Sequence, residues 1–169
     1  PIPRALWLGV FHGLSAFNNA GFALFSDNLI GFSDDVWITL PVMIAIILGG
    51  IGFPVIREVL RHHRPGRWSI HTRLTVLTTA VLIAGGFVVF TILEWTHAPT
   101  SGDGSVFDRL WNSLFMSVTA RTAGFNTIDY GQATESSLFV TDLLMLIGGG
   151  SGGTAGGIKV GTLAVLTVA

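Results

Sequence analysis

The sequence contains no cysteine, which excludes disulfide bonds, thiolate metal sites and cysteine nucleophiles from its 169 residues. Charge is also scarce, because only 11% of the residues are Asp, Glu, Lys or Arg, compared with about 25% in ordinary soluble domains. Hydrophobic residues make up 50% of the chain, and the mean hydropathy is +0.65. This composition predicts a protein whose main solvent is the lipid bilayer.

Two long stretches without charged residues support the prediction of a membrane protein. Val36 to Ile56 and Leu74 to Leu93 contain no Asp, Glu, Lys or Arg, and about 20 apolar residues in a helix span the ~30 Å of hydrocarbon. Both are therefore predicted to be transmembrane helices. Neither is a signal peptide, because both lie inside the chain and neither has a charged start followed by a small-residue cleavage site.

The basic residues are concentrated between these stretches, where the loop 57–73 holds five of the nine Lys and Arg residues. Loops rich in Lys and Arg stay on the cytoplasmic side of a membrane, so this basic loop is predicted to be cytoplasmic. Topology alone accounts for its charge, and no nucleic-acid partner is expected. Acids gather at the opposite ends of the stretches, which predicts an acidic outer face that favours cations. These acids are Asp27, Asp34, Asp35, Glu94, Asp103 and Asp108.

Two shorter apolar segments form an internal repeat. Leu6 to Phe17 and Leu110 to Ala120 are too short to cross a bilayer, and segments of this length are commonly re-entrant or buried. Each is followed directly by a similar string, at 18–22 and 121–125, with Ala-Gly-Phe shared at an offset of 103 residues. Upstream, Trp7 pairs with Trp111, Phe11 with Phe115 and Ser15 with Thr119 at an offset of 104.

The chemistry of these loops points to cations. Irregular backbone at membrane depth persists only where it is buried in protein or lines water. The C-terminal end of a half-helix carries roughly half a negative charge, and glycine at 21 and 124 lets successive carbonyl oxygens turn toward one axis and replace the hydration shell of an ion. The alternative, that Gly21 and Gly124 are close-packing residues at helix crossings, does not call for half-length helices.

A glycine-rich run interrupts the span that begins near Leu138. Seven of the ten residues 148–157 are glycine, and each costs a helix about 1 kcal/mol relative to alanine. The run contains G-x-G-x-x-G, but it follows an apolar helix and lacks the Gly-Lys-Ser/Thr of a nucleotide loop, so nucleotide binding is not predicted. Because the chain begins at Pro1 without methionine and Ala169 lies inside an apolar run, we expect an internal piece of a longer protein.

Three motifs occur in an order that resembles the Trk/Ktr/HKT superfamily of potassium uptake proteins. They are a short helix followed by Asn-Asn-Ala-Gly-Phe, a second short helix followed by Arg-Thr-Ala-Gly-Phe, and the glycine run followed by Ile158-Lys159. The resemblance covers nearly the whole chain. It implies an all-α membrane protein, potassium-channel-like, in which repeated helix, pore-loop, helix units surround a central pore. Residues 1–71 would be the second pore repeat and 72–169 the third. The implied function is potassium uptake across the cell membrane, and no enzymatic activity is expected.

The resemblance also implies which residues act. The selectivity filter, where potassium would bind to backbone carbonyls, is matched by Asn19, Ala20, Gly21, Thr122, Ala123 and Gly124. Its supporting neighbours are Asn18, Phe22, Arg121 and Phe125. A gate loop beneath the filter is matched by Gly148, Gly149, Gly150, Ser151, Gly152, Gly153, Thr154, Ala155, Gly156 and Gly157, followed by Lys159. No organic cofactor is expected.

Two charged side chains near these motifs keep alternative roles at this point. Arg121 either donates to loop carbonyls or to an acid such as Asp129, or it lies solvated at the outer mouth. Lys159 either donates to carbonyls of the glycine run or anchors the chain at the cytoplasmic interface, as long basic side chains do.

The resemblance further implies partners and placement. These are membrane lipid, a homodimer of the full subunit and a cytoplasmic nucleotide-binding regulatory ring (TrkA/KtrA-like). The protein would be a multi-pass protein of a bacterial plasma membrane, with its filter loops toward the outside. Selectivity for potassium over sodium stays open, because the first and fourth filters are not in this sequence.

Two rival functions are weighed against a pore. A secondary transporter would place broken helices at the membrane midplane around a small solute, and it needs intramembrane ionisable residues for coupling. Asp142 is the only acid well inside a predicted span. A membrane enzyme would need acids, histidines or a nucleophile converging at one depth, and the sequence offers no such cluster.

Overall fold

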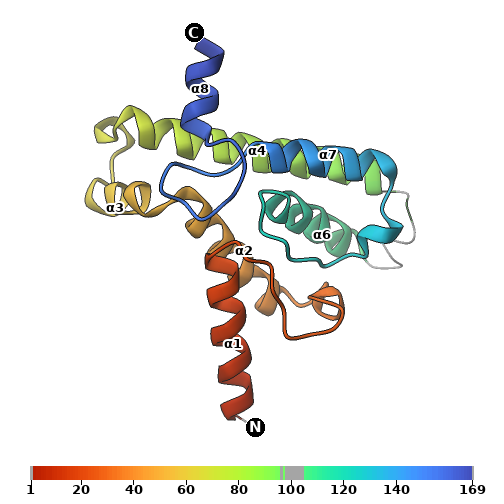
Figure 1. Ribbon diagram of the computed structural model, residues 1–169. Coiled ribbons are helices and arrows are strands. Elements are labelled where there is room, and N and C mark those ends of the chain that lie inside the picture. The colour runs from red at the N-terminus through yellow and green to blue at the C-terminus, as the bar shows by residue number, and fades with distance from the viewer. Residues whose placement is uncertain (1, 96, 98–104, 169) are drawn as a thin grey trace.

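The computed structural model describes residues 2–95, 97 and 105–168, so Pro1, Asp103 and Ala169 lie outside the described part. Within it, every regular element is a helix, apart from one isolated parallel bridge between Ile147 and Ile158. α1 (Ile2–Phe17) and α8 (Val160–Val168) extend to opposite sides of a layer that contains α4 and α7, as Figure 1 shows. The prediction of an all-α chain is confirmed for these residues.

The two short helices predicted before the glycine loops are α1 and α6 (Val106–Thr119), each starting four residues earlier than expected. α6 begins at a capping box, in which the Ser105 hydroxyl accepts from the Asp108 N–H while the Asp108 carboxylate accepts from the Ser105 N–H. With 16 and 14 residues, the two helices reach about 24 and 21 Å. Both are therefore too short to cross a bilayer of ~30 Å.

The predicted continuous helix from Val36 to Ile56 is wrong. α2 (Val36–Ile51) stops at Gly52, and α3 (Phe53–Arg61) leaves at an angle of 98°. Gly52 has φ +94°, outside the helical region, and Pro54 can occupy only the first turn of a new helix. A methyl group at Gly52 would also lie 2.7 Å from the backbone nitrogen of Gly153. The break thus has a local cause in Gly52 and Pro54 and a tertiary cause in the glycine-rich run.

α4 (Ile70–Glu94) confirms the second predicted span. Its 25 residues follow the N-cap Ser69, whose hydroxyl accepts from the Thr72 N–H. Among the described residues it is the one helix long and apolar enough to cross a membrane by itself, and α2 with α3 qualifies only if the bent pair counts as one span. α7 (Glu135–Leu146), whose N-cap is Thr134, lies alongside α4 (Figure 1). The connections contain the short turns η1 (Ile30–Phe32), η2 (Pro65–Arg67) and η3 (Tyr130–Gln132).

Glu94 corrects part of the predicted acidic outer face. Its side chain is 4% exposed, and its carboxylate accepts hydrogen bonds from the hydroxyl of Thr134 at 2.9 Å and from that of Ser137. The carboxylate therefore joins the end of α4 to the start of α7 and is not displayed to solvent. A buried charge needs such donors to offset its lost hydration.

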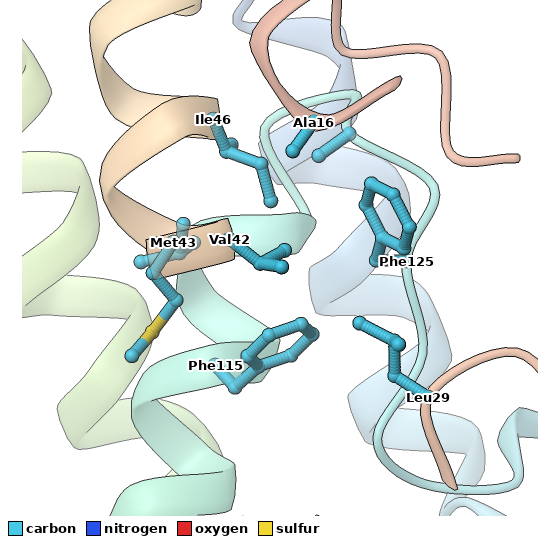
Figure 2. Packing of buried hydrophobic residues seen from close by; sticks show 9 residues of the cluster. Ala16, Leu29, Val42, Met43, Ile46, Phe115 and Phe125 are labelled. Atoms are coloured by element: carbon cyan, nitrogen blue, oxygen red, sulfur yellow. The ribbon is translucent and has the colours of Figure 1, made fainter. Parts of the chain in front are cut away.

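The hydrophobic core lies between α1, α2, α6 and the second glycine loop. Figure 2 shows Phe125 between Ala16 and Leu29, while Ile46 and Val42 approach from α2. Phe125 is fully buried, and burying such a side chain stabilises a fold by about 1.5–3 kcal/mol. This core holds the second glycine loop against α1 and α2. Its buried members are Ala16, Leu29, Val42, Met43, Ile46, Phe115, Val118, Ala123 and Phe125.

One carboxylate connects the basic loop to the membrane helix. Glu58 on α3 accepts hydrogen bonds from the Thr72 hydroxyl, from the Ser69 hydroxyl at 2.7 Å and from the Ser69 N–H. These donors, with Thr72 the largest contributor, lower the pKa of Glu58 from 4.5 to about 2. The charged form therefore stabilises the junction of α3 and α4 above about pH 4.5, and this contribution is lost as the pH falls toward 2.

We expect Glu58→Gln, which removes the charge and keeps the shape, to lower the Tm of the full-length parent in detergent at neutral pH. The difference from wild type should shrink as the pH falls toward 2, because the native carboxyl is then neutral as well. Thermal unfolding at several pH values measures this. Asp34→Asn is the control, since Asp34 is exposed and accepts one side-chain bond, from its neighbour Ser33. A pH-independent difference would assign the effect to packing and not to charge.

Candidate functional site

The two glycine loops have the same backbone shape. In each, a residue with left-handed backbone is followed by alanine and then by a glycine with positive φ: Asn19 (φ 50°) leads to Gly21 (72°), and Thr122 (65°) leads to Gly124 (78°). The repeat found in the sequence is therefore also a repeat of conformation.

Equivalent side chains fold the two loops. The Ser15 hydroxyl donates to the Phe22 carbonyl at 2.8 Å, and the Thr119 hydroxyl donates to the Phe125 carbonyl at 2.6 Å. Ser15 and Thr119 are one of the pairs at the offset of 104 residues. Each hydroxyl sits near the end of its half-helix and closes the loop that follows.

The loops touch each other at their glycines. A methyl group on Gly21 would lie 2.6 Å from the Gly124 Cα and 2.7 Å from the Ala123 carbonyl oxygen, closer than real Cβ atoms approach. Beyond the glycines, the Leu29 N–H donates to the Asn126 carbonyl at 3.0 Å. The two segments thus run side by side as they leave the half-helices.

Asn28 is a bridging residue that was not predicted from the sequence. Its Nδ2 donates to the Gly21 carbonyl at 3.4 Å, and its Oδ1 accepts from the Asn126 N–H at 3.2 Å. His12 is a second such residue, because its Nε2 accepts from the Leu24 N–H at 3.2 Å and its ring stacks on Phe25. Neither side chain belongs to a motif, so no sequence signal could have found them.

The predicted supporting aromatics have different environments. Phe125 is fully buried, whereas Phe22 is 71% exposed in the described part of the chain. Asn18 is exposed, and its Nδ2 donates to the Leu14 carbonyl at 2.8 Å within the end of α1. Direct support of a loop from the core is therefore visible for the second loop and not for the first.

The glycine-rich run forms a closed loop between α7 and α8. The Gly148 N–H donates to the Ile158 carbonyl at 3.0 Å, and the Ile158 N–H donates to the Leu146 carbonyl at 2.9 Å. Lys159 Nζ donates to the Ala155 carbonyl at 2.5 Å and to the Gly153 carbonyl at 3.4 Å. Of the two interpretations of Lys159, the structure favours bonding to loop carbonyls.

This loop lies against the end of α2 with no space for side chains at its closest points. The Gly150 N–H donates to the Gly50 carbonyl at 2.9 Å, and the Thr154 N–H donates to the Gly49 carbonyl at 3.1 Å. These bonds satisfy two of the last carbonyls of α2, which have no partner within the helix. A methyl group on Gly149 would lie 2.2 Å from the Gly50 oxygen, so the close approach requires glycine there.

Arg121 connects the second glycine loop to the glycine-rich run. Its side chain is 6% exposed, and Nη2 donates to the Gly148 carbonyl at 3.0 Å. The solvated alternative therefore does not hold. Asp129 accepts instead from the Gly131 N–H. Gly148 lies two residues beyond Leu146, the last residue of α7, and a positive charge is favourable near the C-terminus of a helix.

Two cavities border the loops. One of about 10 Å³, roughly the space that one water needs, is lined by Arg121, Asn19 and Gly50 among others. The other, about 300 Å³ and partly open, is lined by Gly124 together with Asp142 of α7. Asp142, the acid noted in the sequence, therefore borders the same space as the second glycine loop.

Residues 3–168 match the family model TrkH, described as a cation transport protein. The chain belongs to this family, and its all-α fold is that of a membrane transport protein. The crystal structure of the potassium transporter TrkH from Vibrio parahaemolyticus superposes with a TM-score of 0.76 over 95% of this chain and 34% of that one, at 23% identity. This likeness concerns the fold.

Curated relatives are similar over nearly the whole chain. The potassium/sodium uptake protein NtpJ of Enterococcus hirae is 42% identical over 165 residues, 98% of this chain and 36% of that protein. The Ktr system potassium uptake protein B of Bacillus subtilis is 43% identical over 161 residues, 95% of this chain and 36% of that protein. The chain thus spans about a third of the length of these relatives.

Proposed function

We propose that this chain supplies two of the four repeats of a pore that takes up potassium across the cell membrane. The observation that carries the proposal is the contact of two equally folded Ala-Gly loops, at Gly21 and Gly124, each at the C-terminal end of a half-helix. The names of the relatives, which are potassium or potassium/sodium uptake proteins, support the same cargo. Residues 1–71 form the second repeat and 72–169 the third.

The filter works through backbone carbonyls. The half-helices α1 and α6 direct the negative ends of their dipoles at the loops, and a dehydrated potassium ion exchanges its water for carbonyl oxygens. No side-chain charge and no organic cofactor is required, and potassium is the cargo. The carbonyls belong to Asn19, Ala20, Gly21, Thr122, Ala123 and Gly124, supported by Asn18, Phe22, Arg121 and Phe125.

The glycine-rich run 148–157 is the gate. It obstructs the pore beneath the filter, and Lys159 holds its shape through the carbonyls of Gly153 and Ala155. Because its backbone is not helical and is held by individual hydrogen bonds, it can move without unfolding α7 or α8. This mobility is what a gate requires.

The orientation of the protein in the membrane follows from the position of its basic residues. The basic loop 57–73 faces the cytoplasm, so the filter loops open to the outside of a bacterial plasma membrane. The complete subunit forms a homodimer in membrane lipid, and a cytoplasmic nucleotide-binding ring regulates it from the side of the basic loop. The name of the Bacillus subtilis relative, a component of a "Ktr system", supports an assembly of this kind.

The test is ion flux through the full-length parent in liposomes, comparing potassium, rubidium, sodium and lithium. We expect potassium and rubidium to pass and lithium to be excluded, because carbonyl sites discriminate by ion size and dehydration. Empty liposomes and liposomes with heat-unfolded parent are the controls. Absence of any ion flux, combined with uptake of an organic solute, would overturn the proposal.

A second candidate is a secondary transporter of a small solute with broken helices at the membrane midplane. The observation that favours it is Asp142, which borders the cavity of about 300 Å³ beside Gly124 and could bind a coupling ion. Asp142→Asn separates the two functions. A carrier would lose coupled uptake, whereas a carbonyl filter would keep its selectivity.

A further inference from the structure

The gate loop is bonded to both filter loops, and it is bonded at equivalent positions. The Gly156 N–H donates to the Thr122 hydroxyl oxygen at 2.8 Å. On the opposite side, the Thr154 hydroxyl lies 2.9 Å from both Asn19 Oδ1 and the Phe17 carbonyl and can donate to either. Asn19 and Thr122 are the left-handed residues of the two filter loops. The same position in each repeat therefore uses its side chain to hold the gate loop.

The backbone conformation of Thr122 links its hydrogen bond with the gate loop to the shape of the filter loop. A β-branched residue at positive φ is a genuine outlier, and such strain persists only where the surroundings impose it. The gate loop is part of these surroundings, through the bond from Gly156 to the Thr122 hydroxyl. If the gate loop leaves, Thr122 loses a partner that favours its strained conformation.

The two filter loops are also connected to each other at this point. Asn19 Nδ2 donates to the Arg121 carbonyl at 3.4 Å, and Arg121 itself donates to the Gly148 carbonyl. A displacement of the gate loop therefore acts on the side chain of Asn19 and on the residue that precedes Thr122. The carbonyls next to these residues are those assigned to the filter.

We propose that Asn19, Thr122 and Thr154 are positioning residues that latch the gate loop to the filter, so that displacement of the loop and binding of ions in the filter influence each other. This proposal rests on the pore function proposed above. Coupling of this kind is reciprocal, because any effect of the loop on ion affinity implies an equal effect of the ion on the loop.

The first test is Thr154→Val in the full-length parent, which is reconstituted in liposomes without its regulatory partner. It removes one of the proposed latch contacts without changing a filter residue. The substitution keeps the shape and removes the hydroxyl. We expect the maximal potassium flux to rise by about two- to tenfold, the effect of one lost hydrogen bond on the loop equilibrium, and the KM for potassium to shift as well. Thr154→Ser, which keeps the hydroxyl, should behave as wild type.

Thr79→Val is the matched control for the same chemical change. Thr79 is buried in α4, and its hydroxyl has no hydrogen-bond partner among the described residues. Replacing it with valine should therefore leave both flux and KM unchanged. A comparable rise in flux in this control would show that the effect at Thr154 is not specific to the latch.

A labelling experiment tests reciprocity without relying on flux. Ser151 is exposed within the gate loop, so Ser151→Cys in a parent without other reactive cysteines reports how accessible the loop is to a methanethiosulfonate reagent. We expect potassium to change the labelling rate, and Thr122→Val to reduce this dependence on potassium. Thr122→Ser, which keeps the oxygen that accepts from Gly156, should restore it.

The possible outcomes distinguish failure of the proposed latch from failure of the proposed pore function. A conducting, potassium-selective wild type in which Thr154→Val leaves flux and KM unchanged, and Thr122→Val leaves the potassium dependence of labelling unchanged, would overturn the latch and leave the pore standing. Reduced flux at unchanged KM and unchanged labelling would also overturn it, because it would indicate a merely structural role. A wild type without ion flux would overturn the pore and, with it, the coupling.

Discussion

Gly124→Ser in the full-length parent is expected to reduce the selectivity for potassium over sodium by about tenfold or more. Gly124 has φ +78°, and a Cβ there would lie 3.1 Å from the Cα of Gly21. A non-glycine residue in such a conformation costs about 1–3 kcal/mol, and the loop can relieve this strain by rotating the carbonyls that we assign to the filter. Flux ratios for potassium and sodium in liposomes measure the effect.

Gly85→Ser is the matched control for this substitution. Gly85 lies within α4, and in the described part of the chain no heavy atom outside the adjoining helix backbone lies within 4 Å of the position that its Cβ would occupy. Serine is also a better helix former than glycine, so this variant should keep both its flux and its selectivity. Unchanged selectivity in Gly124→Ser as well would mean that the second glycine loop does not form the filter.

Gly49→Ala is expected to prevent normal folding of the parent. The added methyl group would lie 1.8 Å from the Phe17 carbonyl oxygen and 2.9 Å from the Thr154 hydroxyl. The clash with Phe17 decides the outcome, because the carbonyl oxygen is part of the backbone at the end of α1 and cannot move aside as a flexible side chain could. Overpacking of this kind costs about 1–3 kcal/mol or more, and α2 would have to separate from α1. The yield of monodisperse protein and its Tm in detergent measure the loss.

Gly13→Ala makes the same chemical change where the structure has space. Among the described residues, no heavy atom outside the adjoining helix backbone lies within 4 Å of the Cβ position at Gly13 in α1, and alanine favours the helix by about 1 kcal/mol. The Tm should stay constant or rise. Equal losses in Gly49→Ala and Gly13→Ala would contradict the close contact of α2 with the end of α1.

Local patterns predicted much of this molecule correctly. The low charge and the length of the apolar run predicted α4, because the hydropathy of a single helix decides whether it can lie in a bilayer. The repeated Ala-Gly-Phe predicted two equivalent loops after two short helices, and the structure has both with matching backbone angles. Glycine density predicted the interruption between α7 and α8.

The failures have an equally physical cause. The expected helix from Val36 to Ile56 satisfied every hydropathy criterion, yet Gly52 and Pro54 break it where the glycine-rich run approaches. Glu94 was predicted to lie on the acidic outer face, but it is buried between two helices. Its carboxylate accepts hydrogen bonds there from the Thr134 and Ser137 hydroxyls. In both cases the deciding partner lies far along the chain, and no local window contains it.

The sequence by itself thus determined that the chain is a helical membrane protein with two repeated glycine loops and a glycine-rich interruption, because hydropathy, helix propensity and glycine content are properties of neighbouring residues. Only the tertiary structure decided that Gly21 meets Gly124, that Arg121 donates to Gly148, and that Thr154 reaches the end of α1 across 137 residues of sequence. These contacts depend on how separate helices pack, and packing brings together backbone atoms whose proximity no periodicity records.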